Sequence, residues 1–154
     1  MKVADVMVRD VSHCTPDTKV STAAAILKEM VCGILPVVSE GRIVGVASDR
    51  DLLLALAAGD LKPSEVTVGQ AMTTKVHTTS ASSELSVAMA TMKVCQLRRL
   101  PVVDDSGRVV GIISASDIVW HTDERPNSWN VSFRDAIETV QQATARRRHT
   151  KKRG

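Results

Sequence analysis

The sequence predicts an α/β (α+β) protein in which one small unit occurs twice. Three observations predict it: an internal repeat, helical spacing of apolar residues followed by two short apolar runs, and a shared polar motif where strand passes to helix. A chain of 154 residues with 44% hydrophobic content can bury one core of ordinary size. We therefore expect one compact domain or two closely packed halves.

The repeat is clearest at residues 35–38, whose sequence Leu-Pro-Val-Val recurs at residues 100–103. The same shift of 65 residues carries Met7 onto Met72. Beyond this segment the shift becomes 66, because the following turn has one more residue in the second copy. A duplicated structural unit tolerates such an insertion in a loop.

Each copy has the same order of predicted elements. The apolar residues that fall on one helical face are Val20, Ala24, Leu27 and Val31 in the first copy, and Leu85, Ala88, Met89 and Met92 in the second. Two strands follow the first of these helices, over residues 34–38 and 42–47. A unit therefore consists of a strand, a helix, two strands and a helix.

The second helix of each copy is predicted over residues 49–58 and 116–121. The first of these two is apolar nearly all round, at Leu52, Leu53, Leu54 and Leu56, so we expect it to pack on two sides, against a partner subunit among others.

The predicted boundaries are 1–62 for the first motif, 63–121 for the second, 122–145 for a linker with an appended helix, and 146–154 for a basic tail. The polar linker is expected to begin at Trp120 and the appended helix to cover residues 131–148. Neither motif alone has enough residues for a convincing core. We expect the two to pack face to face about a pseudo-two-fold axis.

Composition narrows the class of protein. The three cysteines, Cys14, Cys32 and Cys95, are an odd number without C-x-x-C spacing, which favours buried thiols over a disulfide framework or a zinc knuckle. Cys32 and Cys95 are expected among apolar helical positions. No apolar run is long enough to cross a bilayer and the N-terminus has no signal-peptide pattern, so we expect a cytoplasmic protein with no membrane partner.

The two strand-to-helix passages carry the candidate chemistry, because residues 45–51 and 111–117 both contain Gly-x-x-Ser-x-x-Asp. A helix N-terminus offers free N–H groups to phosphate, the serine adds a hydroxyl, and a carboxylate can accept both ribose hydroxyls. Glycine in the strand lets a backbone or a ligand approach closely. The alternative is that serine and aspartate only cap the helices. Repetition of the motif in register favours a nucleoside phosphate.

The chain resembles the CBS domain family. The resemblance rests on Asp5-Val6-Met7, on the two Leu-Pro-Val-Val runs, on Val44-Gly45-Val46 with Ser48 and Asp51, and on Val110-Gly111-Ile112 with Ser114 and Asp117. It implies two β-α-β-β-α motifs that form one Bateman module with two ligand clefts and usually dimerise. It also implies a regulatory protein that binds AMP, ADP, ATP, NAD or S-adenosylmethionine and relays occupancy to an unidentified partner, without catalysis.

The resemblance also assigns roles to residues. The ribose would be held by Asp51 and Asp117; ribose or phosphate would be contacted by Ser48, Ser114, Arg50, Arg98 and Arg99; and the base pockets would include His13, Thr78, Ile34, Pro36 and Pro101. The copies differ in charge, since Ile34 is replaced by Arg99 in the second copy and Arg50 by Ser116. An arginine fork suits phosphate, so we expect Arg98 and Arg99 to face a polyphosphate. A solvated strand edge is the alternative for both.

Other functions have weaker support. His13, His77 and His121 lack metal-ligand spacing, and the sequence contains no nucleophile elbow, Walker loop or His-Glu-x-x-His motif, so neither a metal site nor a catalytic site is expected. The basic run at residues 146–153 would bind nucleic acid through phosphate neutralisation, or would serve only as a solubilising tail. A dimerisation scaffold with empty clefts is a third alternative.

Overall fold

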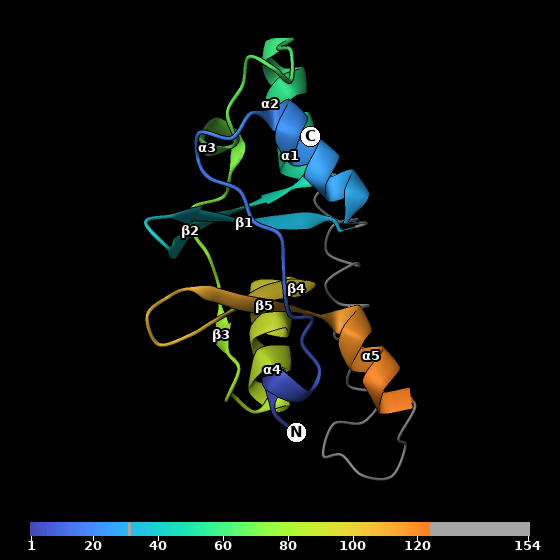
Figure 1. Ribbon diagram of the computed structural model, residues 1–154. Coiled ribbons are helices and arrows are strands. Elements are labelled where there is room, and N and C mark those ends of the chain that lie inside the picture. Colours follow the sequence, from blue (N-terminus) through green and yellow to red (C-terminus); the bar gives the residue numbers. More distant parts are fainter. Residues whose placement is uncertain (31, 124–154) are drawn as a thin grey trace. The chain divides into compact units, whose positions relative to one another are not determined.

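The structure, a computed structural model, describes residues 1–30 and 32–123 (Figure 1). The chain divides into two compact units. Of the described residues, unit 1 comprises Met1–Asp10, His77–Asp105 and those from Val110 to Asp123, and unit 2 comprises Val11–Val76 and Ser106–Val109. The predicted appended helix at 131–148 and the basic tail at 146–154 lie outside the described residues. No helix in the described part combines the length and the apolar character needed to span a membrane.

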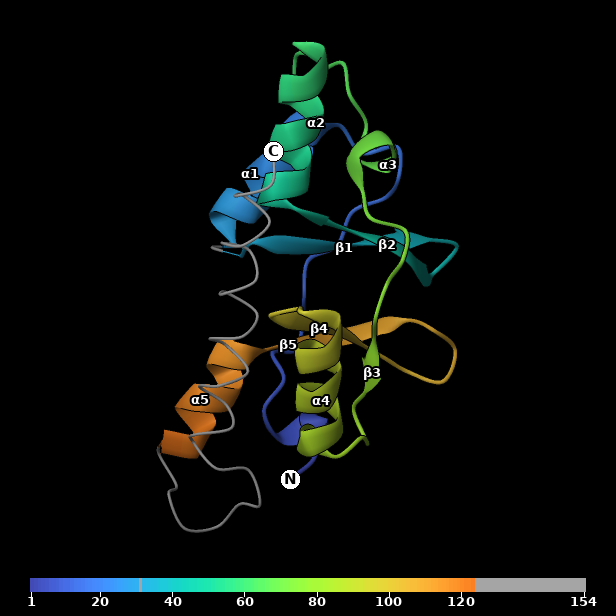
Figure 2. The same cartoon turned by 180° about the vertical axis from the view of Figure 1, so that it is seen from behind.

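Unit 2 contains helices α1 (Val20–Glu29), α2 (Asp49–Gly59) and α3 (Val68–Ala71) and strands β1 (Ile34–Ser39) and β2 (Arg42–Ser48). The two strands pair antiparallel through a two-residue turn in which Glu40 and Gly41 have φ of 50° and 76°. Two positive φ values give the turn a twist that matches the flanking strands. Helices α1 and α2 lie on the same side of the β1–β2 pair (Figures 1 and 2). The predicted helix, hairpin and second helix of the first copy are confirmed.

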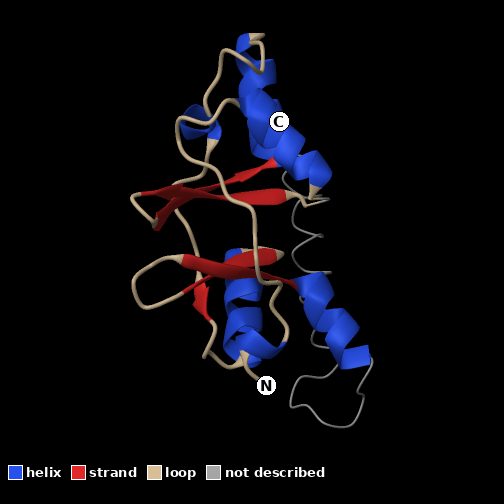
Figure 3. Cartoon of the chain, viewed as in Figure 1, coloured by secondary structure: helices blue, strands red, loops and turns tan. Residues whose placement is uncertain are grey.

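Unit 1 contains the 3-10 helix η1 (Val3–Asp5), helices α4 (Leu85–Cys95) and α5 (Ala115–Asp123), and strands β3 (Thr79–Ser80), β4 (Arg99–Val103) and β5 (Val109–Ser114). The strand order is β3-β4-β5, with β3 parallel to β4. Helices α4 and α5 lie on one side of the β4–β5 pair (Figure 3). The linker expected from Trp120 was wrong at its start, because α5 continues to Asp123. No helix breaker stands before Pro126.

The predicted first strand of each copy is short. In the second copy it consists of the two residues of β3, and in the first copy it is a single parallel bridge between Cys14 and Val37. The short helices η1 and α3, which were not predicted, occupy matching places in the two copies.

The two copies exchange their leading segments. The first ten residues of the chain belong to unit 1, whereas the corresponding part of the second copy, with α3, belongs to unit 2. In unit 1, Val8 pairs antiparallel with Ile112 of β5; in unit 2, Thr73 pairs antiparallel with Val46 of β2. These two pairs correspond to each other under the sequence repeat. The compact units therefore differ from the duplicated segments 1–62 and 63–121, and the same exchange occurs in both units.

Each unit has its own apolar core. In unit 2, Val20, Ala23 and Leu27 of α1 pack with Leu35 and other buried residues of the unit. The expectation that Ala24 belongs to this face was wrong: Ala24 is exposed, because the buried stripe follows positions 20, 23 and 27. Val31, the fourth predicted member, lies outside the described residues.

The core of unit 1 confirms the predicted helical face in full. The four residues of α4 that are buried are those expected, Leu85, Ala88, Met89 and Met92. They pack against Leu100 and Val102 of β4 and Ile113 of β5. The carbonyl of Met1 accepts the Leu85 N–H at 2.9 Å, so the exchanged segment also caps this helix.

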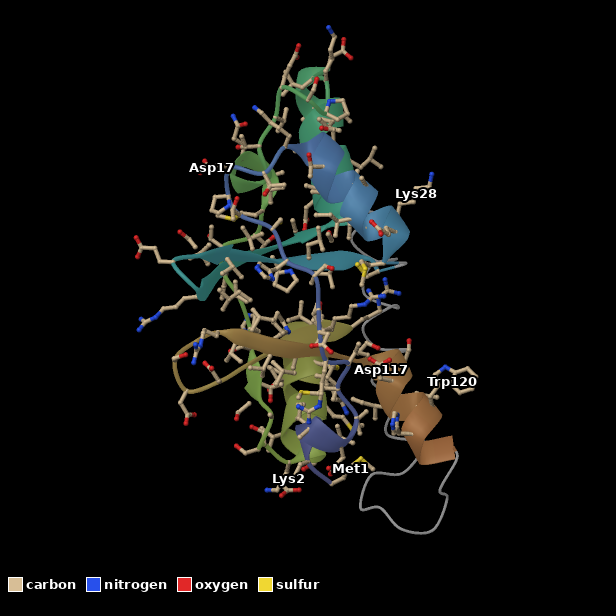
Figure 4. All side chains as sticks on the ribbon, in the orientation of Figure 1. Met1, Lys2, Asp17, Lys28, Asp117 and Trp120 are labelled. Carbon is tan, nitrogen blue, oxygen red and sulfur yellow. The ribbon has the colours of Figure 1, made fainter. Side chains whose placement is uncertain are left out.

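The side chain of Glu84 anchors the exchanged segment of unit 1. The Lys2 Nζ lies 2.7 Å from Glu84 Oε1 and the N-terminal ammonium lies 3.5 Å from Oε2. The hydrogen bond and the charge of Lys2 lower the pKa of Glu84. Figure 4 shows Met1 and Lys2 together at the start of the chain. Because the Lys2 and Glu84 side chains are both exposed to solvent, their ion pair contributes little to stability.

Candidate functional site

The first candidate corner lies where β2 passes into α2. The N–H and the hydroxyl of Ser48 both donate to Asp51 Oδ2, at 3.0 and 2.7 Å, and the Asp51 N–H donates to Ser48 Oγ at 3.1 Å. The two residues form a reciprocal cap in which each side chain satisfies the other residue's N–H. Both side chains are half-buried.

The second corner, where β5 passes into α5, has the same geometry. Ser114 donates from its N–H and its hydroxyl to Asp117 Oδ2, at 2.9 and 2.6 Å, and the Asp117 N–H donates to Ser114 Oγ at 3.1 Å. Asp117 lies at the first turn of α5, with Trp120 further along the same helix (Figure 4). The duplicated motif therefore folds into one geometry in both units.

Helix capping, the alternative that the sequence left open, is what these contacts show. The cap leaves one carboxylate oxygen of each aspartate available to a ligand, because it uses only Oδ2. Within the described part of the chain, Oδ1 of Asp51 and Oδ1 of Asp117 have no hydrogen-bond partner. An ionised carboxylate offers about four acceptor positions on its two oxygens. A ribose hydroxyl can therefore donate to Oδ1 while the cap stays intact.

The second corner has two arginines, one just before and one at the start of the neighbouring strand β4, whereas the first corner has Gly33 and Ile34 at the corresponding positions before and in β1. The carbonyl of Arg98 accepts the N–H of Ala115, the first residue of α5, at 2.9 Å, which places the backbone before β4 beside Ser114 and Asp117. Arg98 is exposed and Arg99 is half-buried. At the first corner the apolar Ile34 pairs with Ser48 in the strand register.

The remaining charged candidate, Arg50, is exposed in the first turn of α2, next to Asp51 in sequence. Its N–H donates to the carboxylate of Asp49 at 2.7 Å, so this turn carries charges of both signs. The two corners thus share their cap and differ in the charge that surrounds it.

The residues predicted for the base pockets lie on the strands. Leu35 belongs to the core, and strand alternation places Ile34 and Pro36 on the opposite face of β1. In unit 1 the same alternation places Pro101 opposite Leu100. The rings of Pro36 and Pro101 are buried.

The two remaining base-pocket candidates precede the first strand of each copy. His13 is exposed directly before Cys14, and Thr78 is half-buried directly before β3. The base-pocket roles remain predictions.

Each motif has a glycine in its strand, Gly45 or Gly111. From the sequence, this glycine lets either a backbone segment or a ligand approach closely, and the structure shows which of the two lies there. An ideal Cβ on Gly111 would stand 2.7 Å from the Val8 carbonyl oxygen and 3.0 Å from Met7 Sδ. One on Gly45 would stand 2.6 Å from Met72 Sδ. The close approach is therefore made by the exchanged segments. Sequence reasoning recognised that Met7 and Met72 repeat but missed what they contact.

Sequence reasoning also missed a contact of a cysteine. The Cys95 Sγ lies 3.4 Å from His77 Nδ1, and both side chains are half-buried. Cys14 is buried as expected, whereas Cys32 is half-buried and follows α1, so its expected helical position was wrong. All three cysteines are free. In the described residues, no cluster of three or more His, Cys, Asp or Glu side chains could hold a metal ion.

The sequence profile of the CBS domain matches residues 3–58 and again residues 68–122. The chain belongs to the CBS domain family. It carries two CBS domains. A curated relative is the "CBS domain-containing protein YhcV" of Bacillus subtilis, 31% identical over 116 residues that cover 75% of this chain and 81% of the relative.

Solved structures of CBS domain pairs share the fold. The CBS domain pair of protein MJ0100, in complex with 5-methylthioadenosine and S-adenosyl-L-methionine, superposes with a TM-score of 0.73 at 28% identity, over 81% of this chain and 98% of that one. CBSX2 in complex with AMP gives a TM-score of 0.71 at 29% identity, over 82% of this chain and 98% of that one. Two proteins with this fold therefore bind adenosine-containing ligands.

Proposed function

We propose that this CBS domain pair is a regulatory module that binds an adenine nucleotide, AMP, ADP, ATP or NAD, through its two serine-aspartate corners. The observation that carries the proposal is the repeated geometry in which the cap occupies Oδ2 of Asp51 and of Asp117 and leaves Oδ1 open. The adenosine ligands of MJ0100 and CBSX2 give the ligand class. The module binds its ligand and catalyses no reaction on it.

In the proposed complex, a ribose hydroxyl donates to Oδ1 of each aspartate, and the N-terminal turn of α2 or α5 faces the phosphate. Free N–H groups and the helix dipole favour an anion at that position. The regulatory effect requires only that the ligand bind one arrangement of the module better than another. The difference in affinity is then passed on to a protein partner.

The two corners are proposed to differ in ligand. Arg98 and Arg99 beside Ser114 and Asp117 add positive charge for a β- or γ-phosphate, and guanidinium groups donate paired hydrogen bonds to phosphate. The first corner has Arg50 with Asp49 instead, so less net positive charge surrounds it. We therefore assign ADP or ATP to the corner of unit 1.

Titration calorimetry with AMP and ATP tests the proposal. The Asp51→Ala, Asp117→Ala double variant should lose binding, because both ribose acceptors are gone. Asp17→Ala is the matched control, since that carboxylate is exposed and lies outside both corners. Circular dichroism establishes that each variant is folded. Unchanged nucleotide affinity in a folded double variant would remove the ribose assignment.

Arginine variants separate the two corners. Arg98→Ala with Arg99→Ala should weaken ATP binding more than AMP binding, because AMP lacks the phosphates that these side chains are assigned to. Arg50→Ala is the comparison at the other corner. Equal losses for ATP and AMP would contradict the polyphosphate assignment.

A dimerisation scaffold with empty clefts is the second candidate, and the caps favour it, since each aspartate already has a structural use. It predicts that AMP, ADP, ATP, NAD and S-adenosylmethionine all leave the melting temperature unchanged. A ligand at 100 times its Kd should stabilise the fold by about 2.7 kcal/mol, which thermal shift detects readily.

A homodimer is part of the proposal. Leu52 of α2 is buried, whereas Leu53 and Leu54 are 65% and 52% exposed, so α2 presents an apolar face that unit 2 does not cover. An exposed face of this kind is typical of a surface that associates. In the proposed homodimer, a partner subunit would bury this face.

A further inference from the structure

Among the described residues, Cys95 has an imidazole neighbour that the other two cysteines lack. It is the last residue of α4, and its Sγ lies 3.4 Å from Nδ1 of His77. At this distance the thiol donates to a neutral imidazole nitrogen, or an imidazolium N–H donates to a thiolate. A thiol with a base in hydrogen-bond reach is the arrangement that activates a cysteine nucleophile. Both side chains are half-buried, so the sulfur is not sealed in the core.

The other two thiols have inert surroundings. Cys14 is 4% exposed, its Sγ lies 3.9 Å from the carbonyl oxygen of Pro36, and burial raises its pKa to about 11. Cys32 is half-buried and packs against the apolar core of unit 2. Among the described residues, neither has an imidazole within hydrogen-bond distance.

The pair is specific to the second copy of the repeat. Under the 65-residue shift, His77 corresponds to Ser12 and Cys95 to Met30. The first copy folds into matching elements without this pair, so the fold of a CBS domain does not require it. His77 directly precedes Thr78, which is predicted to lie near the base of a bound nucleotide.

We propose that Cys95, activated by His77, is a thiol modification site that reacts with hydroperoxides. The thiol proton passes to Nδ1 of His77 as the sulfur attacks the peroxide. One S–O bond forms and the O–O bond breaks. Sulfur is oxidised by two electrons to the sulfenic acid, the peroxide is reduced, and with hydrogen peroxide the leaving hydroxide takes up the proton as water.

The test uses the full chain and compares its own three thiols. The protein is exposed to hydrogen peroxide for increasing times, remaining thiols are trapped with iodoacetamide, and each cysteine peptide is quantified by mass spectrometry. Cys95 should be oxidised about a hundredfold faster than Cys32, the lower end of the gain that a positioned proton acceptor gives. Cys14 should react most slowly because it is buried.

Histidine variants decide whether the imidazole causes the difference. His77→Leu removes the proton acceptor and should bring the Cys95 rate down to that of Cys32. His121→Leu is the matched control, because His121 is exposed and its Nδ1 faces the carbonyl oxygen of Asp117. That variant should leave the Cys95 rate unchanged.

His77→Asn carries the same test if the leucine variant fails to fold, since the amide is polar but not basic. Equal oxidation rates of Cys95 and Cys32 in the unmodified sequence would overturn the proposal. So would a Cys95 rate that is unaffected in folded His77 variants. Neither result depends on nucleotide binding, so the thiol proposal stands or falls separately from the proposed function.

Discussion

The carbonyl oxygen of Val8 lies 2.7 Å from the point that a Cβ on Gly111 would occupy. Real Cβ atoms do not approach an oxygen so closely, so the pairing of the exchanged segment with β5 depends on glycine. In unit 2, the point that a Cβ on Gly45 would occupy lies 2.6 Å from Sδ of the Met72 side chain. In both units the glycine of the Gly-x-x-Ser-x-x-Asp motif lets a segment of the other copy pack against the strand.

We expect Gly111→Ala to lower the free energy of unfolding by about 2 kcal/mol and Gly45→Ala by about 1 kcal/mol, within the range for overpacking. The first is larger because the clash is with backbone, whereas the Met72 side chain can turn away. Urea unfolding followed by circular dichroism measures both. Equal effects, or no loss in Gly111→Ala, would contradict the packing described here.

Removing a corner hydroxyl should cost helix stability. Ser48→Ala and Ser114→Ala each lose the acceptor for an aspartate N–H, and we expect a loss of about 1 kcal/mol for each, as for other N-caps. Thermal or urea unfolding measures the change. Ser86→Ala, at an exposed position inside α4, is the control and should be neutral or slightly stabilising. A corner variant as stable as this control would show that the cap contributes nothing.

Burial of Cys14 predicts a loss of stability at alkaline pH. Its pKa rises from the ordinary value of 9.0 to about 11 in the folded chain, so the unfolded state binds fewer protons between these values. The contribution is fully present below pH 9.0 and is lost as pH rises through the folded pKa. We expect a decrease of about 2 kcal/mol across this window.

Urea unfolding at pH 8 to 11 measures this slope, and Cys14→Ala supplies the reference. The variant will be less stable throughout because it opens a cavity, so the slopes are compared and not the absolute values. Parallel slopes for the two proteins would argue against ionisation of Cys14 as the cause.

The outer face of α2 should govern association. Leu53→Lys with Leu54→Lys places two charges on the exposed apolar face and should convert a dimer to a monomer in sedimentation velocity. Val8→Lys changes another exposed apolar residue, 55% exposed in unit 1, and should leave the sedimentation coefficient unchanged. A double variant that remains dimeric would place the interface elsewhere.

Most of the secondary structure and the two corners could be predicted from the sequence, because local patterns determine them. The turn residues and apolar runs identified β1 and β2, and the spacing of Leu85, Ala88 and Met92 identified α4. The face of α1 was misjudged at Ala24, since small residues at adjacent positions 23, 24 and 25 leave the hydrophobic stripe ambiguous. The end of α5 was placed too early because the polar residues after Trp120 resemble a linker.

By itself, the sequence determined that one unit is duplicated and that each copy carries a Ser-x-x-Asp motif where a strand passes into a helix, because the motif depends on residues a few positions apart and the duplication is visible as a repeat. Only the tertiary structure decided that the copies exchange their leading segments, that Val8 reaches Gly111, and that His77 meets Cys95. These contacts join residues far apart in the chain, and no local pattern encodes them. They depend on the buried strands and helices that bring such segments side by side.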